Sequence, residues 1–204
     1  MKSKVFLRRG TALALVVAGI CAASLMFGAE DPKAPVQHFS GTAANVSGAP
    51  DPLKIDLLRW STDSERDQLS AALDKSEKDF VAALGKEPTL GYIWTSESAG
   101  YTVRYAYRIQ ATDGSQRIIV AADKPLGSWN PQIWRPSGNA KGNNYDFTVV
   151  ELRLPARRGV PGEGKSSLLA KVIVDKTAKS VALDGYAAAP VVLKNVKWEN
   201  GPSS

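Results

Sequence analysis

Hydrophobic and polar residues alternate with a period of two over much of this chain, which is the pattern of β-strands that bury one face. The longest such run is 101–110, where aromatic and aliphatic residues alternate with Thr, Arg and Gln. The alternation predicts that one face of this strand carries Tyr101, Val103, Tyr105, Tyr107 and Ile109. The sequence TDGS at residues 112–115 is typical of a hairpin turn, so we expect pairing with a strand at residues 117–122.

Other short apolar runs are bounded by Gly, Pro, Asp or Asn. They predict further strands at residues 38–46, 53–58, 90–94, 145–154, 168–174, 181–186 and 191–198. Because short connections join successive strands, we expect them to pair antiparallel. The chain is therefore predicted to have an α+β, β-rich fold, in which about eight or nine strands form an antiparallel barrel or a sandwich.

One segment, residues 62–84, has apolar residues at helical spacing instead. It begins with the sequence TDSE, in which Thr62 and Glu65 are spaced to form a capping box. Gly85 and then Pro88 end the pattern. We expect this helical segment to pack on the β-structure, either as one helix or as two helices joined near Lys75.

The N-terminus has a different composition. Four basic residues, Lys2, Lys4, Arg8 and Arg9, precede a stretch at 10–29 without any charge. A basic start, an apolar centre and small residues at the end are typical of an export signal, which predicts a signal peptide at residues 1–29. The protein is then expected to be periplasmic or secreted. We expect a flexible lead-in at residues 30–37, a single β-rich domain at 38–198 and a disordered tail at 199–204.

Three variants of this interpretation stay open, and all three place the domain outside the cytoplasm. The 20 uncharged residues from Gly10 to Ala29 are long enough to serve as an uncleaved membrane anchor. Cys21 suggests a lipid attachment site, although Ile20 is larger than the residue such sites require before the cysteine. The Arg8-Arg9 pair suggests twin-arginine export, although the residues after it are not hydrophobic.

Removing the signal changes the charge and the cysteine content. Four of the 26 basic residues lie in residues 1–29, whereas all 20 acidic residues follow, so the remainder carries +2. Such a balanced surface does not favour nucleic-acid binding. The single Cys, Cys21, lies in the signal, so the exported domain has no thiol for a disulfide, a nucleophile or a metal site.

Two features could be mistaken for functional motifs. Residues 159–166, GVPGEGKS, fit the phosphate-binding pattern G-x-x-x-x-G-K-[ST], but the following run ends in Val-Ile-Val and favours a strand over a helix. We interpret the motif as a Gly-rich loop between strands and expect no nucleotide. His38 is the only histidine, which excludes a multi-histidine metal centre and leaves one candidate base for a Ser-His-Asp triad. We expect no metal and no cofactor.

Two regions are candidates for ligand binding. Arg59 and Trp60 stand at the junction between a predicted strand and the helical segment, where they could line a pocket or fasten the helix to the sheet. Trp129, Trp134 and Arg135 lie in a long loop at residues 123–144, where aromatic side chains suit ligand or glycan contact. A hydrophobic lid over one end of the β-structure would explain these tryptophans equally well.

The chain also resembles a known group of proteins. The strings RWSTDSERDQL, GYIWTSESAGYTVRYAYRIQ, DGSQRIIVAADKPL, YDFTVVELRLP, GEGKSSLLAKVIVD and GYAAAPVVLKNV occur here in an order similar to that in a widespread family of uncharacterised secreted bacterial proteins. The resemblance covers residues 38–198. It implies a bacterial source, a single domain and a loop position for GEGKSS, and it implies no activity.

These observations favour a non-enzymatic binding module for a small apolar or amphipathic ligand or for an envelope partner. A barrel beside an aromatic loop would serve as a container for such a ligand. The alternative function is a hydrolase of envelope polysaccharide, in which two carboxylates would face each other across a cleft near Trp129 or Trp134. Membrane contact is expected only through residues 1–29, if they are not cleaved.

Overall fold

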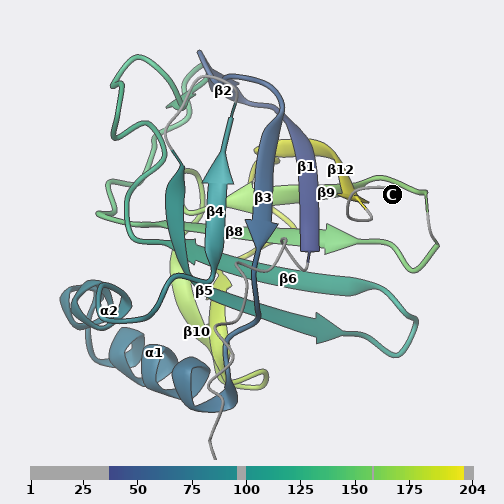
Figure 1. Ribbon diagram of the computed structural model, residues 1–204. Helices are drawn as coiled ribbons and strands as arrows, with labels where there is room; N and C mark the ends of the chain where they lie inside the picture. Colours follow the sequence, from purple (N-terminus) through teal and green to yellow (C-terminus); the bar gives the residue numbers. More distant parts are fainter. Residues whose placement is uncertain (1–36, 96–99, 158, 200–204) are drawn as a thin grey trace, which may run out of the picture. The chain divides into compact units, whose positions relative to one another are not determined.

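The computed structural model describes residues 37–95, 100–157 and 159–199, and within them eight antiparallel strands form a closed barrel in the order β1-β12-β9-β8-β6-β5-β4-β3 (Figure 1). The strands are β1 (Gln37–Ala43), β3 (Leu53–Leu57), β4 (Gly91–Trp94), β5 (Tyr101–Gln110), β6 (Gln116–Ala122), β8 (Thr148–Leu154), β9 (Gly162–Ser166) and β12 (Leu193–Glu199). The predicted fold class is confirmed, and the structure decides for a barrel over a sandwich.

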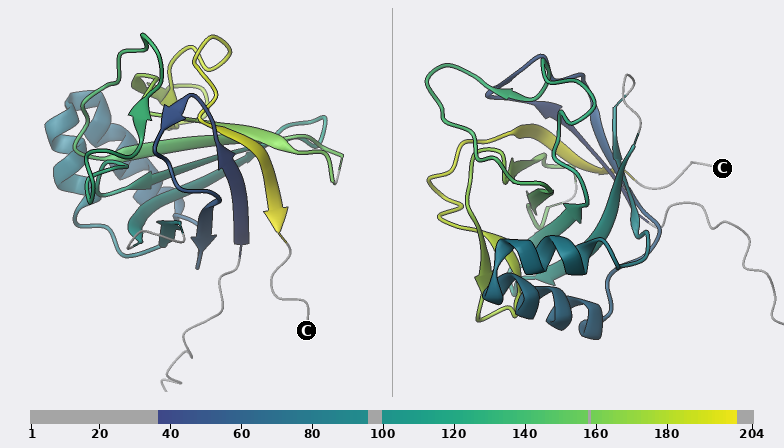
Figure 2. Two further views of the ribbon diagram at one scale, coloured as in Figure 1. Left: turned by 90° about the horizontal axis from the view of Figure 1, so that it is seen from above. Right: turned by 90° about the vertical axis from the view of Figure 1, so that its left-hand side faces the viewer.

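Two short sheets and two helices complete the described part of the chain. β2 (Val46–Ser47) pairs with β7 (Arg135–Pro136), and β10 (Val172–Asp175) pairs with β11 (Ser180–Leu183). The helices are α1 (Asp63–Lys75) and α2 (Glu77–Leu84). They lie together on one side of the barrel wall, as both views of Figure 2 show. None of the helices described is both long enough and apolar enough to cross a membrane.

The helical segment begins as its sequence predicts and then divides. The Thr62 hydroxyl accepts a hydrogen bond from the Glu65 amide, and the Glu65 carboxylate accepts one from the Thr62 amide, which completes the capping box. At Ser76 the backbone turns extended and α1 ends. The Ser76 side chain accepts from the Asp79 amide and starts α2, so one serine ends the first helix and caps the second.

The interior of the barrel is filled with apolar side chains. They include Phe39, Leu53, Ile55, Ile93, Tyr101, Val103, Ile118, Val120, Leu152 and Val196, each at most 2% exposed. Interiors packed in this way exclude ligands as large as a fatty chain. The container predicted from the sequence is therefore occupied by the protein's own side chains.

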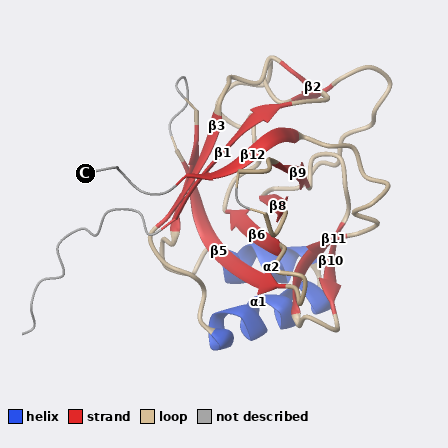
Figure 3. Cartoon of the chain, turned by 90° about the vertical axis from the view of Figure 1, so that its right-hand side faces the viewer, coloured by secondary structure: helices blue, strands red, loops and turns tan. Residues whose placement is uncertain are grey.

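A second apolar core lies outside the wall, between the barrel and its cover. Leu69, Phe80 and Leu84 of the helices pack there against Tyr105, Ile119 and Val149 of the barrel and Val181 and Leu183 of β11. Figure 3 shows β10 and β11 beside the helices. Most of β6 and β8 is therefore buried on both faces, whereas β5 ends in the exposed residues Arg108 and Gln110.

The side-chain pattern of β5 departs from the prediction. The register between β5 and β6 shifts between Val103 and Tyr105, which marks a bulge. As a result Val103 and Ala106 pack in the barrel interior, whereas Tyr105 packs in the outer core. The prediction that all five alternating residues share one face is wrong, because the extra residue moves the second half of the strand to the other face.

Residues 162–166 form strand β9, so the prediction that GEGKSS belongs to a loop is also wrong. Gly164 lies between β8 and β12, where a Cβ atom would stand 2.7 Å from Leu152 Cδ2 and 3.1 Å from Leu193 Cβ. A larger residue here would force the Leu152 and Leu193 side chains to move, which favours glycine at this position. The strand predicted at residues 168–174 begins later, at Val172.

The ends of the predicted domain shift slightly as well. Gln37, placed in the lead-in by the sequence, is the first residue of β1, and Glu199, placed in the tail, is the last residue of β12. The predicted signal peptide at 1–29, the rest of the lead-in and residues 200–204 lie outside the described residues.

Candidate functional site

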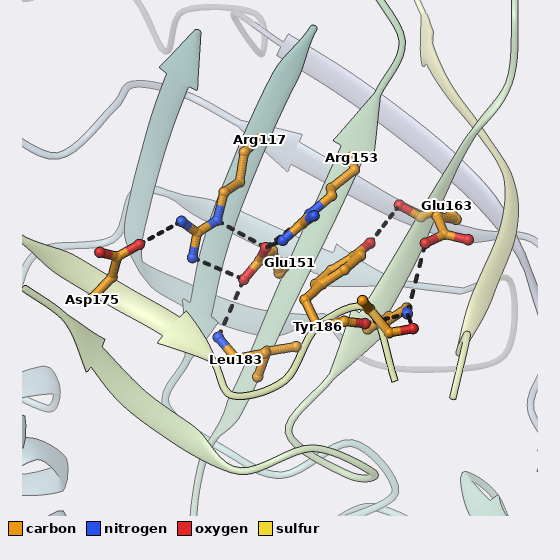
Figure 4. Close-up of polar contacts among 9 residues, drawn as sticks. Arg117, Glu151, Arg153, Glu163, Asp175, Leu183 and Tyr186 are labelled. Atoms are coloured by element: carbon orange, nitrogen blue, oxygen red, sulfur yellow. Dashed lines mark hydrogen bonds and ion pairs between the residues drawn. The ribbon is translucent and has the colours of Figure 1, made fainter. Parts of the chain in front are cut away.

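A buried carboxylate organises the outer face of the wall. Glu151 of β8 is fully buried, and its Oε1 accepts a hydrogen bond from Arg117 Nε of β6 at 2.8 Å (Figure 4). Its Oε2 accepts from Arg117 Nη2 at 3.2 Å and from the Leu183 amide at 3.2 Å. A buried carboxylate requires such partners, because an unpaired charge away from water is costly.

Arg153 of β8 is the second cation at this carboxylate. Its Nε and Nη2 donate to Glu151 Oε1 at 3.3 and 3.2 Å. Its Cζ lies 3.6 Å from the centre of the Tyr186 ring, a cation–π contact that holds the guanidinium plane in place. The Arg153 side chain is 48% exposed, so about half of it remains in contact with solvent.

Strand register brings the two arginines together. Arg117 stands directly opposite Arg153 in the β6–β8 ladder. Like charges in this position repel, and Glu151 lies between them and neutralises the repulsion. Burial lowers the pKa of Arg117, but its hydrogen bonds to Asp175 and Glu151 outweigh burial and raise the pKa above the ordinary value.

The network also fastens the β10–β11 hairpin to the wall. Arg117 Nη1 donates to Asp175 Oδ2 of β10 at 2.7 Å. Backbone hydrogen bonding from Ala178 and the contact with Arg117 hold the pKa of Asp175 below its ordinary value. Together with the bond from the Leu183 amide, this contact joins the hairpin to β6 and β8.

Lys165, the lysine of the phosphate-loop pattern, is buried and already satisfied. Its Nζ donates to the carbonyl oxygens of Tyr186 and, at 3.4 Å, of Ala187, and it lies 4.4 Å from the centre of the Tyr186 ring. Glu163 Oε1 is 3.8 Å away. The motif therefore lies on a strand that holds the turn at residues 185–189, not on a loop that presents backbone amides to phosphate.

A cleft of about 440 Å³ opens beside the network. Its lining combines the apolar residues Ile109, Ala111, Leu154 and Pro155 with Ser115, Gln116, Arg117 and Arg153. Pockets of this size that combine apolar walls with a few polar groups are typical of small-molecule sites. Both arginines of the network line the cleft, whereas the carboxylates of Glu151 and Asp175 do not.

Two smaller cavities are described. One of about 220 Å³ lies between α1 and the β10–β11 hairpin, and its lining includes Asp67, Asp74 and Lys176. The other, of about 20 Å³ beside Leu126 and Phe147, has room for roughly one water molecule. The cleft at the arginines is the largest of the three.

The structure places the predicted residues Arg59 and Trp60 at one end of the barrel. Arg59 binds both carboxylate oxygens of Glu65, at 2.7 and 2.9 Å, and donates to the Trp60 carbonyl oxygen. Trp60 packs against the interior core, and Arg108 Cζ lies 5.2 Å from the centre of its ring. These contacts fit a fastening role, and neither residue lines a described cavity.

The loop residues predicted for binding are not brought together. Trp129 is 52% exposed with Lys124 Nζ 4.3 Å from the centre of its ring, whereas Trp134 is 2% exposed and packs in the interior core. Arg135 pairs with Ser47 in the β2–β7 ladder and donates from Nε to the Pro131 carbonyl oxygen at 2.8 Å. None of the three lines a described cavity.

His38 lies on the part of the wall that the helices leave uncovered. Its Nδ1 is 2.7 Å from Asp56 Oδ1, and Trp94 Nε1 donates to Asp56 Oδ2 at 2.5 Å. The nearby Ser40 hydroxyl donates to Glu199 rather than to the histidine. Within the described ranges, no three His, Cys, Asp or Glu residues gather in a way that could hold a metal ion.

Sequence reasoning missed Arg117, Glu151 and Arg153. One signal was available: β8 reads TVVELRL, and its charged residues interrupt an otherwise apolar strand. A charge within such a strand indicates a partner on a neighbouring element.

Comparison with protein-family models, with curated proteins and with solved structures finds no match to this chain, so the resemblance noted from its motifs stays a prediction.

Proposed function

We propose that this chain is an exported bacterial binding module that takes a small amphipathic ligand in the cleft beside Arg117 and Arg153. One observation carries the proposal: the cleft of about 440 Å³ places two arginine side chains next to Ile109, Leu154 and Pro155. Apolar walls that meet a few fixed polar groups suit a ligand with an apolar chain and a polar head. The filled barrel interior favours this outer cleft over a ligand inside the barrel.

The export part of the proposal rests on the basic and apolar segments of residues 1–29. Expression of the full chain in a bacterium and fractionation should place it in the periplasm or the medium. Mass spectrometry should then show either a new N-terminus near residue 30 or an intact chain in the membrane fraction. A chain found intact in the cytoplasm would contradict export.

Binding is tested by titrating the exported form with amphiphiles that carry twelve-carbon chains, below their micelle concentrations, in a calorimeter. Ile109→Asp puts a charge on the apolar wall of the cleft, and we expect it to weaken binding. Ile173→Asp is the matched control, because Ile173 is an exposed isoleucine of β10 that does not line the cleft. Failure of every amphiphile to bind, or equal weakening by both substitutions, would overturn the cleft as the site.

The alternative hydrolase needs two facing carboxylates near Trp129 or Trp134. Among the described cavities, the one that holds two acidic residues is lined by Asp67 and Asp74 of α1 instead. Each is already in an ion pair, with Arg66 and Lys176 respectively. No observation therefore favours the hydrolase over the binding module.

A further inference from the structure

We infer that the cleft selects anionic amphiphiles, and that the free end of the Arg153 guanidinium receives their carboxylate or phosphate head group. The inference rests on the proposed function and names the chemical class of its ligand. It depends on three features of Arg153: which of its donors are used, how the side chain is held, and where the neutralising carboxylates lie.

Some hydrogen-bond donors of the Arg153 guanidinium are unused. A guanidinium carries five N–H groups in a rigid fork. Arg153 directs Nε and Nη2 toward Glu151 Oε1, at 3.3 and 3.2 Å. Nη1 has no acceptor within the described part of the chain, and Nη2 keeps a second hydrogen. The end of the fork, formed by Nη1 and Nη2, is therefore free to bind two oxygens of one anion.

The side chain is held before any ligand arrives. Glu151, which is fully buried, fixes one edge of the guanidinium, and the Tyr186 ring lies against its plane at 3.6 Å. Tyr186 is itself only 6% exposed, and its hydroxyl donates to the Glu163 carbonyl oxygen at 3.4 Å. An arginine ordered in this way loses little conformational freedom on binding, which favours affinity.

The position of the carboxylates decides the sign of the ligand. Glu151 and Asp175 balance the charges of Arg117 and Arg153, so the network is neutral as a whole. The two arginines line the cleft, whereas Glu151, Asp175 and Glu163, which stands opposite Arg153 in the β8–β9 ladder, do not. A ligand in the cleft thus meets the cationic edge of a neutral cluster, and this edge attracts anions and repels cations.

The apolar part of the ligand has its own surface. Ile109, Leu154 and Pro155 line the same cleft as Arg153. A chain that lies on them brings a head group at its end next to the guanidinium. A carboxylate and a phosphate monoester both present two oxygens at the spacing of the fork, so this geometry accepts either.

The test compares four amphiphiles with the same twelve-carbon chain: dodecanoate, dodecyl phosphate, dodecyl maltoside and dodecyltrimethylammonium. Calorimetric titration of the exported form should show that the two anions bind about tenfold or more tightly than the neutral and cationic compounds, which corresponds to about 1.4 kcal/mol. Raising the salt concentration should weaken the binding of the anions only.

Substitutions place the preference at Arg153. Arg153→Gln should remove the preference for anions, whereas Arg153→Lys, which keeps the charge but lacks the fork, should retain part of it. Arg135→Gln is the matched control, because Arg135 is an exposed arginine that does not line the cleft. Circular dichroism melts of each variant confirm that the fold persists.

The outcomes separate the two proposals. Binding of only one of the two anions supports the inference and identifies the head group. Equal binding of all four compounds, or an anion preference that survives Arg153→Gln, overturns the inference and leaves the binding module standing. Failure of all four to bind the unaltered protein overturns the proposed function itself.

Discussion

The two halves of the barrel wall are buried differently. In β6, every side chain from Ile118 to Ala122 is buried, because the interior core lies on one face and the helices and β11 cover the other. In β3, buried Leu53, Ile55 and Leu57 alternate with partly exposed Lys54 and Asp56, because none of the described helices or strands covers its outer face. One half of the wall is therefore shielded from water on both faces, and the other half is shielded on its inner face only.

The difference matters most for charged groups. On the covered half, Glu151 is fully buried and its charge is compensated by Arg117 and Arg153. On the uncovered half, Asp56 holds His38 and Trp94, but its side chain remains 17% exposed to water. Low polarity strengthens the first set of contacts and raises the cost of losing any member. Arg153, which these contacts hold in place, lies on the covered half and lines the cleft.

Removal of the buried carboxylate should have the largest effect. Glu151→Ala removes the buried acceptor shared by Arg117, Arg153 and the Leu183 amide and leaves Arg117 with Asp175 alone, so we expect the free energy of unfolding to fall by about 3–5 kcal/mol. Chemical denaturation monitored by circular dichroism measures the change.

The control for this substitution is Asp74→Ala, which breaks an exposed ion pair with Lys176 on the covering layer. Such pairs contribute about 0–1 kcal/mol. If both substitutions cost the same, Glu151 has no special role in holding the covered half together.

Neighbouring residues on one strand test the two faces directly. On β6, Ile118 and Ile119 are both fully buried, and replacing either with Ala should lower the free energy of unfolding by about 2–5 kcal/mol. On β4, Ile93→Ala should cost a similar amount, but Tyr92→Ala, at a side chain that is 43% exposed, should change it by about 0.5 kcal/mol or less. A small effect of Ile119→Ala would show that the helices contribute little to the outer core.

The smallest effect on stability is expected at the start of α1, where the helices that cover the barrel wall begin. Hydrogen bonding from Arg59 lowers the pKa of Glu65 to about 2, below its ordinary value of 4.5. Glu65 thus contributes stability above pH 4.5, and this contribution is lost as the pH falls from 4.5 toward 2. Arg59→Ala should raise the Glu65 pKa by about one unit or more in an NMR titration. An unchanged pKa would assign the shift to the Thr62 cap instead.

Local sequence signals predicted much of the fold. The alternation at residues 101–110 matches the bounds of β5, and TDSE marks the start of α1. The bulge after Val103 was not predictable, because β5 has apolar residues on both sides of it and either register would bury them. Strand β9 was missed because its glycines satisfy packing against β8 and β12, which only the assembled sheet reveals.

The cleft was harder to predict than the fold. Arg117, Glu151 and Asp175 come from β6, β8 and β10, and their contacts depend on a register that joins strands across a long loop and on a hairpin packed outside the wall. Trp129 and Trp134 were predicted to bind a ligand because aromatic side chains stand in a long loop. The structure buries Trp134 in the interior core and exposes Trp129, a difference that composition does not encode.

The packing of strand β9 also bears on its match to the phosphate-binding sequence pattern. Gly162 and Gly164 follow the two-residue period of a strand that is squeezed between its neighbours, and Lys165 is spaced to reach the carbonyl oxygens of the next turn. The close packing at Gly164 and the contacts of Lys165 thus account for two positions of the phosphate-binding pattern, whereas its first glycine, Gly159, precedes β9 and has a φ of 81°. In a random mutagenesis library we expect position 162 to reject every larger residue, because a Cβ atom at Gly162 would stand 2.1 Å from the Arg153 carbonyl oxygen.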